Sequence, residues 1–362
     1  MKKSFEEVFI DKTRYGTKIK TDEYCKSGKH IIVDQSQNAI AGFTDLDSGL
    51  FTDVPAIIFG DHTRVIKYVD EPFFLGADGT KILRSNICNA NYKYLYYALK
   101  NARIPNTGYN RHFKWLKEIE IQYPDEKTQN NIVSLLDKVL YVINLRKDEL
   151  QKLDDLIRAR FVELFGDLRT NTKEWKIQAF SELTDLITDG EHATPRRTTN
   201  GIYLLSARNI LNHAIQLDDV DYIDQEEYDR IAKRVVPQAG DVLISCLGTV
   251  GRCCTVPVGL KFQMVRSAAL LRFKPEINPK FAEYMITSEY LQEQINRLKT
   301  ASSQANLFQG KIAKLKGFAP PMELQQEFNA FVAVIDKSKA TVQKALDETQ
   351  LLFDSLMQQY FG

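Results

Sequence analysis

The feature that most constrains this chain is an internal repeat with an interval of 196 residues. Residues 124–166 and 320–362 align without a gap. Both copies begin at a proline, and they end in Leu164-Phe165-Gly166 and Tyr360-Phe361-Gly362. An internal repeat indicates one structural unit that is used twice. The 362 residues are therefore predicted to form two variable regions, each followed by a copy of the same helix.

Both copies carry residues at alternating intervals of three and four, which is typical of a coiled-coil seam. The first seam is Leu136, Val139, Ile143, Arg146, Leu150, Leu153, Ile157, Arg160 and Leu164. The second is Val332, Ile335, Lys339, Val342, Leu346, Thr349, Phe353, Leu356 and Tyr360. A helix of roughly 40 residues is about 60 Å long. The pattern predicts a spacer, with an ordinary buried helix pair as the alternative.

A second apolar stripe makes the hydrophobic face wider than a two-helix seam requires. Each helix is therefore expected to contact a partner as well as its twin. The residues assigned to partner binding are Ile132, Leu135, Val142, Leu156, Phe161, Phe328, Phe331, Leu352 and Met357.

Composition narrows the class of protein. A hydrophobic fraction of 44% is enough for real cores, and no apolar run is long enough to predict a membrane span. Five cysteines without CxxC spacing favour a reducing cytoplasm, and neither a disulfide framework nor a metal site is expected. The net charge of +1 does not by itself indicate nucleic acid, but basic residues recur before both helices.

The predicted fold class is α/β, with two mixed α/β domains joined by two long antiparallel helices in a pseudo-twofold arrangement. The expected domains are residues 1–123 and 171–319, and the helical spacers are 124–170 and 320–362. Short apolar runs predict strands at 56–59, 202–205 and 242–245. Helices are predicted at 91–99 and, after Asn278-Pro279, at 281–298.

The two variable regions overlay at an offset near 188. Gly60–Arg64 then falls on Gly248–Arg252, and Lys81–Arg84 falls on Ala269–Arg272. The match is weak in identity but consistent in order, which predicts one fold with diverged surfaces.

Three further stretches, in this order and together with the repeat, identify a resemblance over essentially the full chain. They are Asp189–Pro195, Gly240–Ile244 followed by Gly248–Arg252, and Phe318–Pro321 with Glu323 and Gln325. The chain resembles the specificity subunit of type I restriction–modification systems. It departs from that family in its short start, which lacks a leader like Trp175-Lys176-Ile177, and in a single proline, Pro124, before the first helix.

The resemblance implies a non-catalytic subunit whose two target-recognition domains each read half of an asymmetric, bipartite DNA site. The antiparallel helices would set the gap between the half-sites. It also implies two modification subunits, which use S-adenosylmethionine to methylate adenine. Two restriction subunits that use ATP and Mg²⁺ can join them.

Candidate DNA contacts are basic and hydroxyl residues in predicted loops, because such side chains donate to phosphates and base edges. Solvated surface turns are the alternative interpretation. The candidates are His62, Thr63, Arg64, Arg84, Arg111, Thr194, Arg196, Arg197, Arg208, Thr249, Arg252 and Lys311. Asn110, Asn306 and Gln309 are interpreted as structural caps, and His30 and His213 as incidental.

Enzyme signatures are weak. Val69–Phe73 only superficially resembles the target-adenine motif of amino-methyltransferases, and the sequence contains no glycine-rich AdoMet turn and no Walker A motif. No catalytic residue is therefore predicted. Two alternatives stay open: a solitary DNA adenine methyltransferase or a fragment of one, and a coiled-coil adaptor whose two heads bind proteins.

Overall fold

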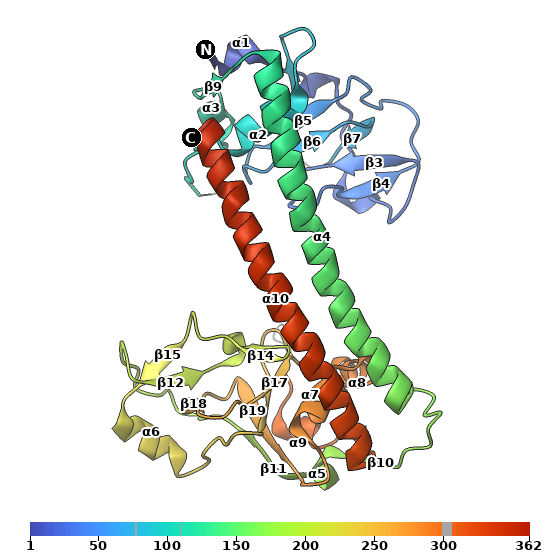
Figure 1. The fold of residues 1–362 in the computed structure, drawn as a ribbon, viewed down its shortest axis with the longest axis vertical. Helices are drawn as coiled ribbons and strands as arrows, with labels where there is room; N and C mark the ends of the chain where they lie inside the picture. The colour runs from blue at the N-terminus through green and yellow to red at the C-terminus, as the bar shows by residue number, and fades with distance from the viewer. Residues whose placement is uncertain (77, 109, 299–305) are drawn as a thin grey trace. The chain divides into compact units, whose positions relative to one another are not determined.

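The chain divides into two compact units in a computed structural model that describes residues 1–76, 78–108, 110–298 and 306–362. The first unit contains Met1–Asp148 and Gln343–Gly362, and the second contains Glu149–Val342. Both divisions fall inside long helices, so each unit holds a sheet region and parts of two helices (Figure 1). The predicted domain boundaries at residues 123, 170 and 319 remain predictions.

The first unit is built on three sheets. Their strand orders are β2-β8-β5-β6, β4-β3-β7 and β1-β9. The strands are β1 Lys2–Ser4, β2 Phe9–Asp11, β3 His30–Val33, β4 Gly42–Thr44, β5 Ala56–Gly60, β6 Ile66–Val69, β7 Phe73–Leu75, β8 Thr80–Ser85 and β9 Glu120–Gln122. The helices of this region are α1 Phe5–Val8, the 3₁₀ turns η1 Thr13–Tyr15 and η2 Thr21–Glu23, α2 Tyr92–Lys100 and α3 Phe113–Leu116.

The second unit repeats this arrangement. Its sheets have the orders β11-β19-β16-β17, β15-β12-β18 and β10-β20, and it adds the two-stranded sheet β13-β14. The strands are β10 Ile177–Ala179, β11 Thr184–Asp189, β12 Ile202–Leu205, β13 Ile210–Leu211, β14 Ala214–Ile215, β15 Asp221–Ile223, β16 Val242–Ser245, β17 Cys253–Thr255, β18 Phe262–Met264, β19 Ala268–Phe273 and β20 Lys316–Phe318. The helices are α5 Phe180–Leu183, η3 Ala207–Asn209, α6 Gln225–Ala232, α7 Pro279–Thr287, α8 Glu289–Leu298 and α9 Gln309–Ile312.

Equivalent strands also share orientation and register, which confirms that the two regions are one fold. In each unit, one strand of the three-stranded sheet pairs parallel on one side (β3 with β7, β12 with β18) and antiparallel on the other. Gly60 at the end of β5 pairs with Thr80, and Ser245 at the end of β16 pairs with Ala268. Thr80 and Ala268 are therefore equivalent, so β8 and β19 align at the predicted offset of 188. The first half has a counterpart of β10, because β1 pairs with β9 as β10 pairs with β20.

Most of the predicted elements are confirmed. The strands at 56–59, 202–205 and 242–245 are β5, β12 and β16, and the helix at 91–99 is α2, whose N-terminus Asn91 caps through its side chain. The single helix expected at 281–298 is wrong. It is divided into α7 and α8 at Ser288, whose backbone is extended and whose hydroxyl donates to the carbonyl of Met285.

In the first unit, one part of the core lies between two sheets. Ala56 and Ile58 on β5 and Ile82 on β8 form one cluster with Val33 and Phe73 from the three-stranded sheet. All five side chains are fully buried. Full burial of a large apolar side chain contributes roughly 1.5–3 kcal/mol to the free energy of folding. These contacts therefore hold the two sheets together.

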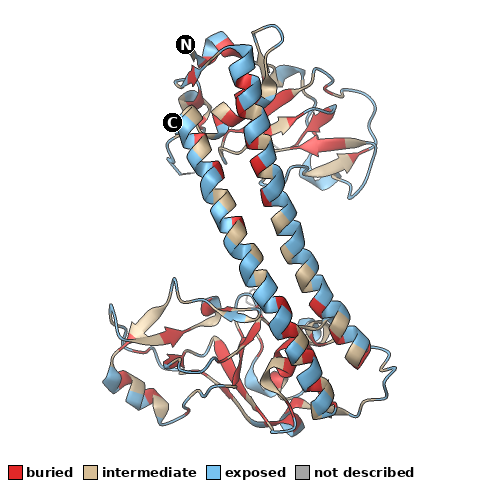
Figure 2. Cartoon of the chain, in the orientation of Figure 1, coloured by how far each residue is buried: buried red, intermediate tan, exposed pale blue. Residues whose placement is uncertain are grey.

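The two repeated segments are the helices α4 (Glu126–Phe165) and α10 (Met322–Phe361), each 40 residues long. The predicted seam is confirmed, because no seam residue is exposed and the buried positions recur along both helices (Figure 2). In the first unit the fully or largely buried seam residues are Leu136, Val139, Ile143, Leu346 and Phe353. In the second unit they are Ile157, Val332 and Ile335.

Polar seam residues set the register of the helix pair. In the first unit Arg146 donates to the carbonyl of Ala345 and to the hydroxyl of Thr349. In the second unit Asp154 pairs with Lys339, and Arg160 pairs with Glu327. The partner number falls on α10 as the number rises on α4, so the helices are antiparallel there. Such polar seam contacts favour one register over its alternatives.

Candidate nucleic-acid interface

The turn between β5 and β6 places three predicted DNA contacts in the first unit. It is closed by bonds from Gly60 N to Val65 O (2.8 Å) and from Arg64 N to Gly60 O (2.7 Å). Arg64 has a φ of 61°, a left-handed conformation that is unusual for a non-glycine residue, and its guanidinium donates to Ile104 O. Thr63 donates its hydroxyl to Gln35 O at 2.7 Å. The backbone N–H of His62, which lies between Asp61 and Thr63, donates to Gln35 Oε1.

The turn between β16 and β17 is its counterpart in the second unit. Ser245 N donates to Arg252 O, and Gly251 N donates to Ser245 O. This pattern matches Gly251, with φ of 93°, to Arg64 and matches Arg252 to Val65. The predicted overlay of Arg64 on Arg252 is therefore wrong. The reason is that the second turn is two residues longer, which an overlay without gaps could not represent.

The segments before α3 and α9 lie against these turns. His112 N donates to Asp61 O, and the Asp61 carboxylate accepts from Phe113 N at 2.7 Å. In the second unit Leu307 N donates to Cys246 O. The first of these bonds brings Arg111 beside its turn. Lys311 is linked to the other turn through Asn306, which accepts from Lys311 Nζ at 3.5 Å and pairs with Leu247. Each unit therefore gathers some of its predicted contacts: His62, Thr63, Arg64 and Arg111 in the first unit, and Thr249, Arg252 and Lys311 in the second.

Arg84 lies elsewhere, at the opposite end of the sheet from the β5–β6 turn. Its guanidinium pairs with Asp53 and donates to Pro55 O, just before β5 begins, and it lies 4.7 Å from the ring centroid of Tyr92. The equivalent Arg272 pairs with Asp241 at 2.8 Å, just before β16. The two arginines therefore have the same structural role. Arg84 links β8 to the segment before β5, and Arg272 links β19 to the segment before β16.

Three other candidate arginines form a separate group in the second unit, where each pairs with carboxylates. Arg196 pairs with Asp224 and Glu226, whereas Arg197 and Arg208 share Asp221. Thr194, two residues before Arg196, is exposed. Exposed ion pairs contribute only about 0–1 kcal/mol each, so these guanidinium groups can exchange a carboxylate for a phosphate at little cost.

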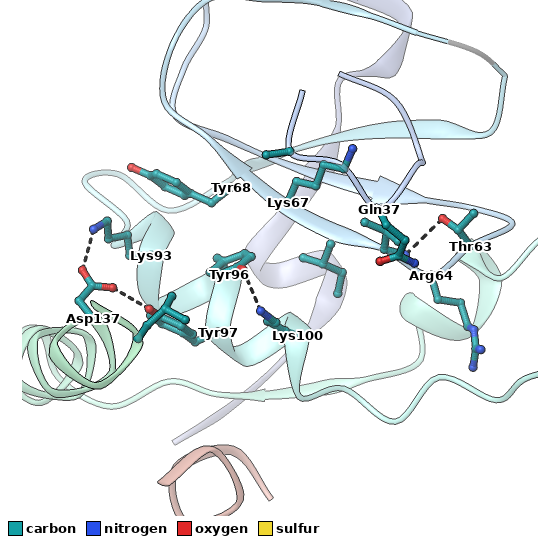
Figure 3. A pocket seen from close by; sticks show the side chains of 14 residues that line it. Gln37, Thr63, Arg64, Lys67, Tyr68, Lys93, Tyr96, Tyr97, Lys100 and Asp137 are labelled. Carbon is teal, nitrogen blue, oxygen red and sulfur yellow. Dashed lines mark hydrogen bonds and ion pairs between the residues drawn. The ribbon is translucent and has the colours of Figure 1, made fainter. Parts of the chain in front are cut away.

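A groove in the first unit was missed by the sequence analysis (Figure 3). We name it the α2 groove. It has a volume of about 720 Å³ and lies between the β5–β6 hairpin, α2 and α4. Its charged and aromatic lining residues are Arg64, Lys67, Tyr68, Lys93, Tyr96, Tyr97, Lys100 and Asp137. The alternation of tyrosine and lysine along residues 92–100 is the signal that could have found it.

Contacts within the α2 groove hold several of these side chains in place. Asp137 on α4 accepts from Lys93 Nζ and from the Tyr97 hydroxyl, both at 2.6 Å. Lys100 Nζ donates to the Tyr96 hydroxyl at 3.2 Å. Burial raises the pKa of Tyr97, and the hydrogen bond to Asp137 raises it further, so this phenol stays protonated. The groove thus presents lysine side chains beside tyrosine hydroxyls.

In the second unit a buried carboxylate occupies the corresponding place. Glu283 on α7 is 1% exposed and contacts His213 Nδ1 (2.5 Å), Lys280 Nζ (2.9 Å) and the Thr255 hydroxyl (2.6 Å). Burial alone would raise the pKa of Glu283, but the His213 hydrogen bond, the two nearby positive charges and the Thr255 hydroxyl lower it to about 2. His213 also stacks on Tyr284, with 4.1 Å between ring centroids, so it has a structural role beside Glu283.

The predicted partner-binding residues separate into two groups. Ile132, Phe161, Phe328 and Met357 are at most 6% exposed, because they pack within their own units. This burial removes them from the predicted partner surface. Phe331 is half-buried against the core of the second unit. The exposed members of the stripe are Leu135, Val142, Leu156 and Leu352.

The described residues show neither a metal-ion site nor a membrane-spanning helix. No group of histidine, cysteine, aspartate or glutamate side chains among them is arranged to hold a metal ion. None of the helices in the described part of the chain combines the length and apolar character needed to cross a bilayer.

Comparison with known proteins adds one family and one fold. Residues 2–155 match the family model of the type I restriction modification DNA specificity domain. The S subunit of a type I restriction–modification system from M. genitalium has a similar structure, with 17% identity, a TM-score of 0.57, and coverage of 100% of this chain and 96% of that one. A chain from a structural study of complex assembly and conformational transition of the type I R-M system is also similar. It has 15% identity and a TM-score of 0.54, and the match covers 100% of this chain and 97% of that one. No curated protein matches the chain.

Proposed function

We propose, from the premise that this chain belongs to the type I restriction–modification DNA specificity subunits, that each of its units reads one half of a split DNA sequence. The chain is a DNA-recognition subunit of such a system. The family model covers the first unit's sheets, and the second unit repeats their strand orders. Two copies of one recognition fold in a single chain carry the proposal.

The differences between the copies support an asymmetric site. The β5–β6 turn carries His62, Thr63 and Arg64, whereas the longer β16–β17 turn carries Thr249, Gly251 and Arg252. Side chains of different shape and donor pattern select different base edges. Each unit is therefore expected to read its own half-site.

The helix pair supports a fixed gap between the half-sites. Both α4 and α10 are continuous, and each begins in one unit and ends in the other. We expect the bases opposite this pair to be untouched and their number to be set by helix length.

The partners are proposed from the family and from the exposed stripe of Leu135, Val142, Leu156 and Leu352. Two modification subunits would dock on the helices and carry S-adenosylmethionine, and two restriction subunits that use ATP and Mg²⁺ can join them. In this proposal the chain supplies recognition and no catalytic step. Methyl transfer requires the target base to leave the stack, and we assign that step to the modification subunit. The matching family model describes a specificity domain and gives no support to the solitary methyltransferase alternative.

The decisive experiment combines the full chain with a modification subunit from the same genome. A random-sequence duplex library is incubated with both proteins and S-adenosylmethionine, and methylated adenines are mapped. We expect one split motif with a constant gap, which disappears when either protein is omitted. Methylation by this chain alone would move catalysis into it, and a continuous motif would contradict the two-reader proposal.

A further inference from the structure

In the part of the chain that the structure describes, the two copies of the fold differ at the face that forms the α2 groove. In the second unit, the connection between β12 and β15 spans residues 206–220 and contains the β13–β14 hairpin. That hairpin is fastened to β17 by a bond from His213 N to Cys253 O, and it places the His213 ring on Tyr284 of α7. In the first unit the connection between β3 and β4 spans only residues 34–41. The corresponding face of α2 therefore stays open.

The open face also differs in charge from the closed one. Counting from the helix caps Asn91 and Asn278, Tyr96 corresponds to Glu283 and Lys100 to Thr287. By strand register, Tyr68 corresponds to Thr255. The equivalence is supported by contacts, because Tyr68 and Tyr96 are ring neighbours just as Thr255 and Glu283 are hydrogen-bonded.

The turn adds a further cation on the open side, since Arg64 stands where the second unit has Gly251. Lys93 corresponds to Lys280, and each is paired with a carboxylate. Lys280 pairs with the buried Glu283 and is 30% exposed, whereas Lys93 pairs with the more accessible Asp137 and is 46% exposed. Lys67 is not part of this open charge. Its ammonium is buried 3.7 Å from Asp34, and Figure 3 shows it pointing away from Tyr96.

We propose that the α2 groove binds backbone phosphates of the DNA beside the half-site read by the first unit. This inference rests on the proposed function. Lysine and arginine contact phosphates without reading sequence, and tyrosine hydroxyls donate to the same oxygens. Thr63 and Arg64 line both the recognition turn and the groove, so a strand in contact with the turn continues into the groove. One lining carboxylate, Asp137, is already occupied by Lys93 and Tyr97.

The asymmetry has a measurable consequence. Among the described residues of the second unit, the corresponding face is covered by that unit's own hairpin, and Glu283 there is buried between His213 and Lys280. The subunit should therefore hold the flank of one half-site by additional phosphate contacts. Ethylation of those phosphates should interfere with binding on the first half-site's flank only.

The test uses the double variant Lys93→Gln, Lys100→Gln in the full chain together with the modification subunit. Binding to a fluorescent duplex that carries the mapped motif is measured between 50 and 200 mM salt. We expect the slope of log Kobs against log salt to become shallower by about 0.9 for each lost contact, with binding roughly eightfold weaker per lysine at 0.1 M salt. The loss should be equal on an unrelated duplex, because phosphate contacts are independent of sequence.

Lys26→Gln is the matched control, because Lys26 is an exposed lysine of the same unit outside the groove. It should leave the salt slope unchanged. An unchanged slope in the double variant would overturn the proposal. So would a variant that binds DNA with the wild-type slope but no longer associates with the modification subunit, since the groove would then be a protein contact. Failure of the proposed function is distinguished by the wild-type protein, which would then give no split motif.

Discussion

At the scale of single residues, equivalent positions in the two units share a backbone conformation but carry different side chains. Arg64 adopts a left-handed backbone conformation that Gly251 adopts in the second unit. Glycine is permitted in this region without steric cost, whereas a side chain there costs about 1–2 kcal/mol. A strained arginine at a loop tip is consistent with selection for contact rather than for stability. The first unit exposes Lys93 on the face of the α2 groove, whereas the second unit buries the Glu283 carboxylate between His213 and Lys280.

The buried carboxylate makes the second unit sensitive to acid. The pKa of Glu283 is about 2 in the folded chain against an ordinary value of 4.5. Because the folded pKa is the lower one, the stabilisation is complete above about pH 4.5 and is lost as the pH falls towards 2. It amounts to roughly 3 kcal/mol over that window. We predict that the variant Glu283→Gln loses less unfolding free energy between pH 5 and pH 3 than the wild type.

The measurement is urea denaturation followed by the fluorescence of Trp175, in a Trp115→Phe background. Trp175 lies in the second unit and stacks on Phe318, whereas Trp115 lies in the first. Glu226→Gln, on an exposed side chain of α6, serves as the control and should keep the wild-type acid dependence. Equal acid dependence in Glu283→Gln and the wild type would contradict the role given to Glu283.

At the scale of elements, α4 presents two apolar surfaces that the repeat alone does not distinguish. Phe161 is buried and contacts the rings of Phe165, Phe281 and Phe328, with centroids 4.9–5.8 Å apart. Leu156 is five residues earlier and 47% exposed. Both residues belong to the stripe that was predicted to bind partners. Only Leu156 remains available for that role.

These two residues give a paired prediction. Phe161→Ala should lower the unfolding free energy of the second unit by about 3–5 kcal/mol, because it leaves a cavity in the aromatic cluster. Leu156→Ala should change stability by less than about 0.5 kcal/mol, yet weaken association with the modification subunit. Urea denaturation and titration calorimetry separate the two effects. The assignment of the exposed stripe to the partner fails if Leu156→Ala, Leu135→Ala and their double variant all bind the modification subunit normally.

At the scale of the whole molecule, the proposed spacer can be tested by changing the length of both helices. Adding seven residues to both helices lengthens each by about 10 Å, which is about three base pairs of DNA at 3.4 Å per step. A heptad also preserves the seam. The insertions belong after Asp148 and after Val342, where the two compact units divide.

We predict that methylation mapping of this variant returns both half-sites unchanged with a longer gap between them. The complementary variant replaces residues 1–123 with the corresponding domain of another specificity subunit, and it should change one half-site only. A heptad variant with an altered half-site and the original gap would contradict the spacer. A domain replacement that alters both half-sites would show that the units do not read independently.

Much of this architecture could be predicted from local patterns. The repeat, the seam and the strands β5, β12 and β16 were predicted at or within a residue of their observed positions. Heptad spacing and apolar runs state directly which side chains must face a neighbour, so they need no knowledge of distant contacts. The common fold of the two units was predicted for the same reason, since the order of their elements survives the divergence of their surfaces.

What the sequence alone determined is therefore the doubled design: two copies of one α/β fold and two helices with a defined seam. Only the tertiary structure decided which candidates meet. It placed Arg84 against Asp53 away from the β5–β6 turn, closed His213 onto Glu283, buried Phe161 and Phe328, and left the α2 groove open. Each of these outcomes depends on residues far apart in the chain and on the lengths of the loops between them. Periodicity encodes which face of an element is buried, but the packing of the whole unit selects its neighbours.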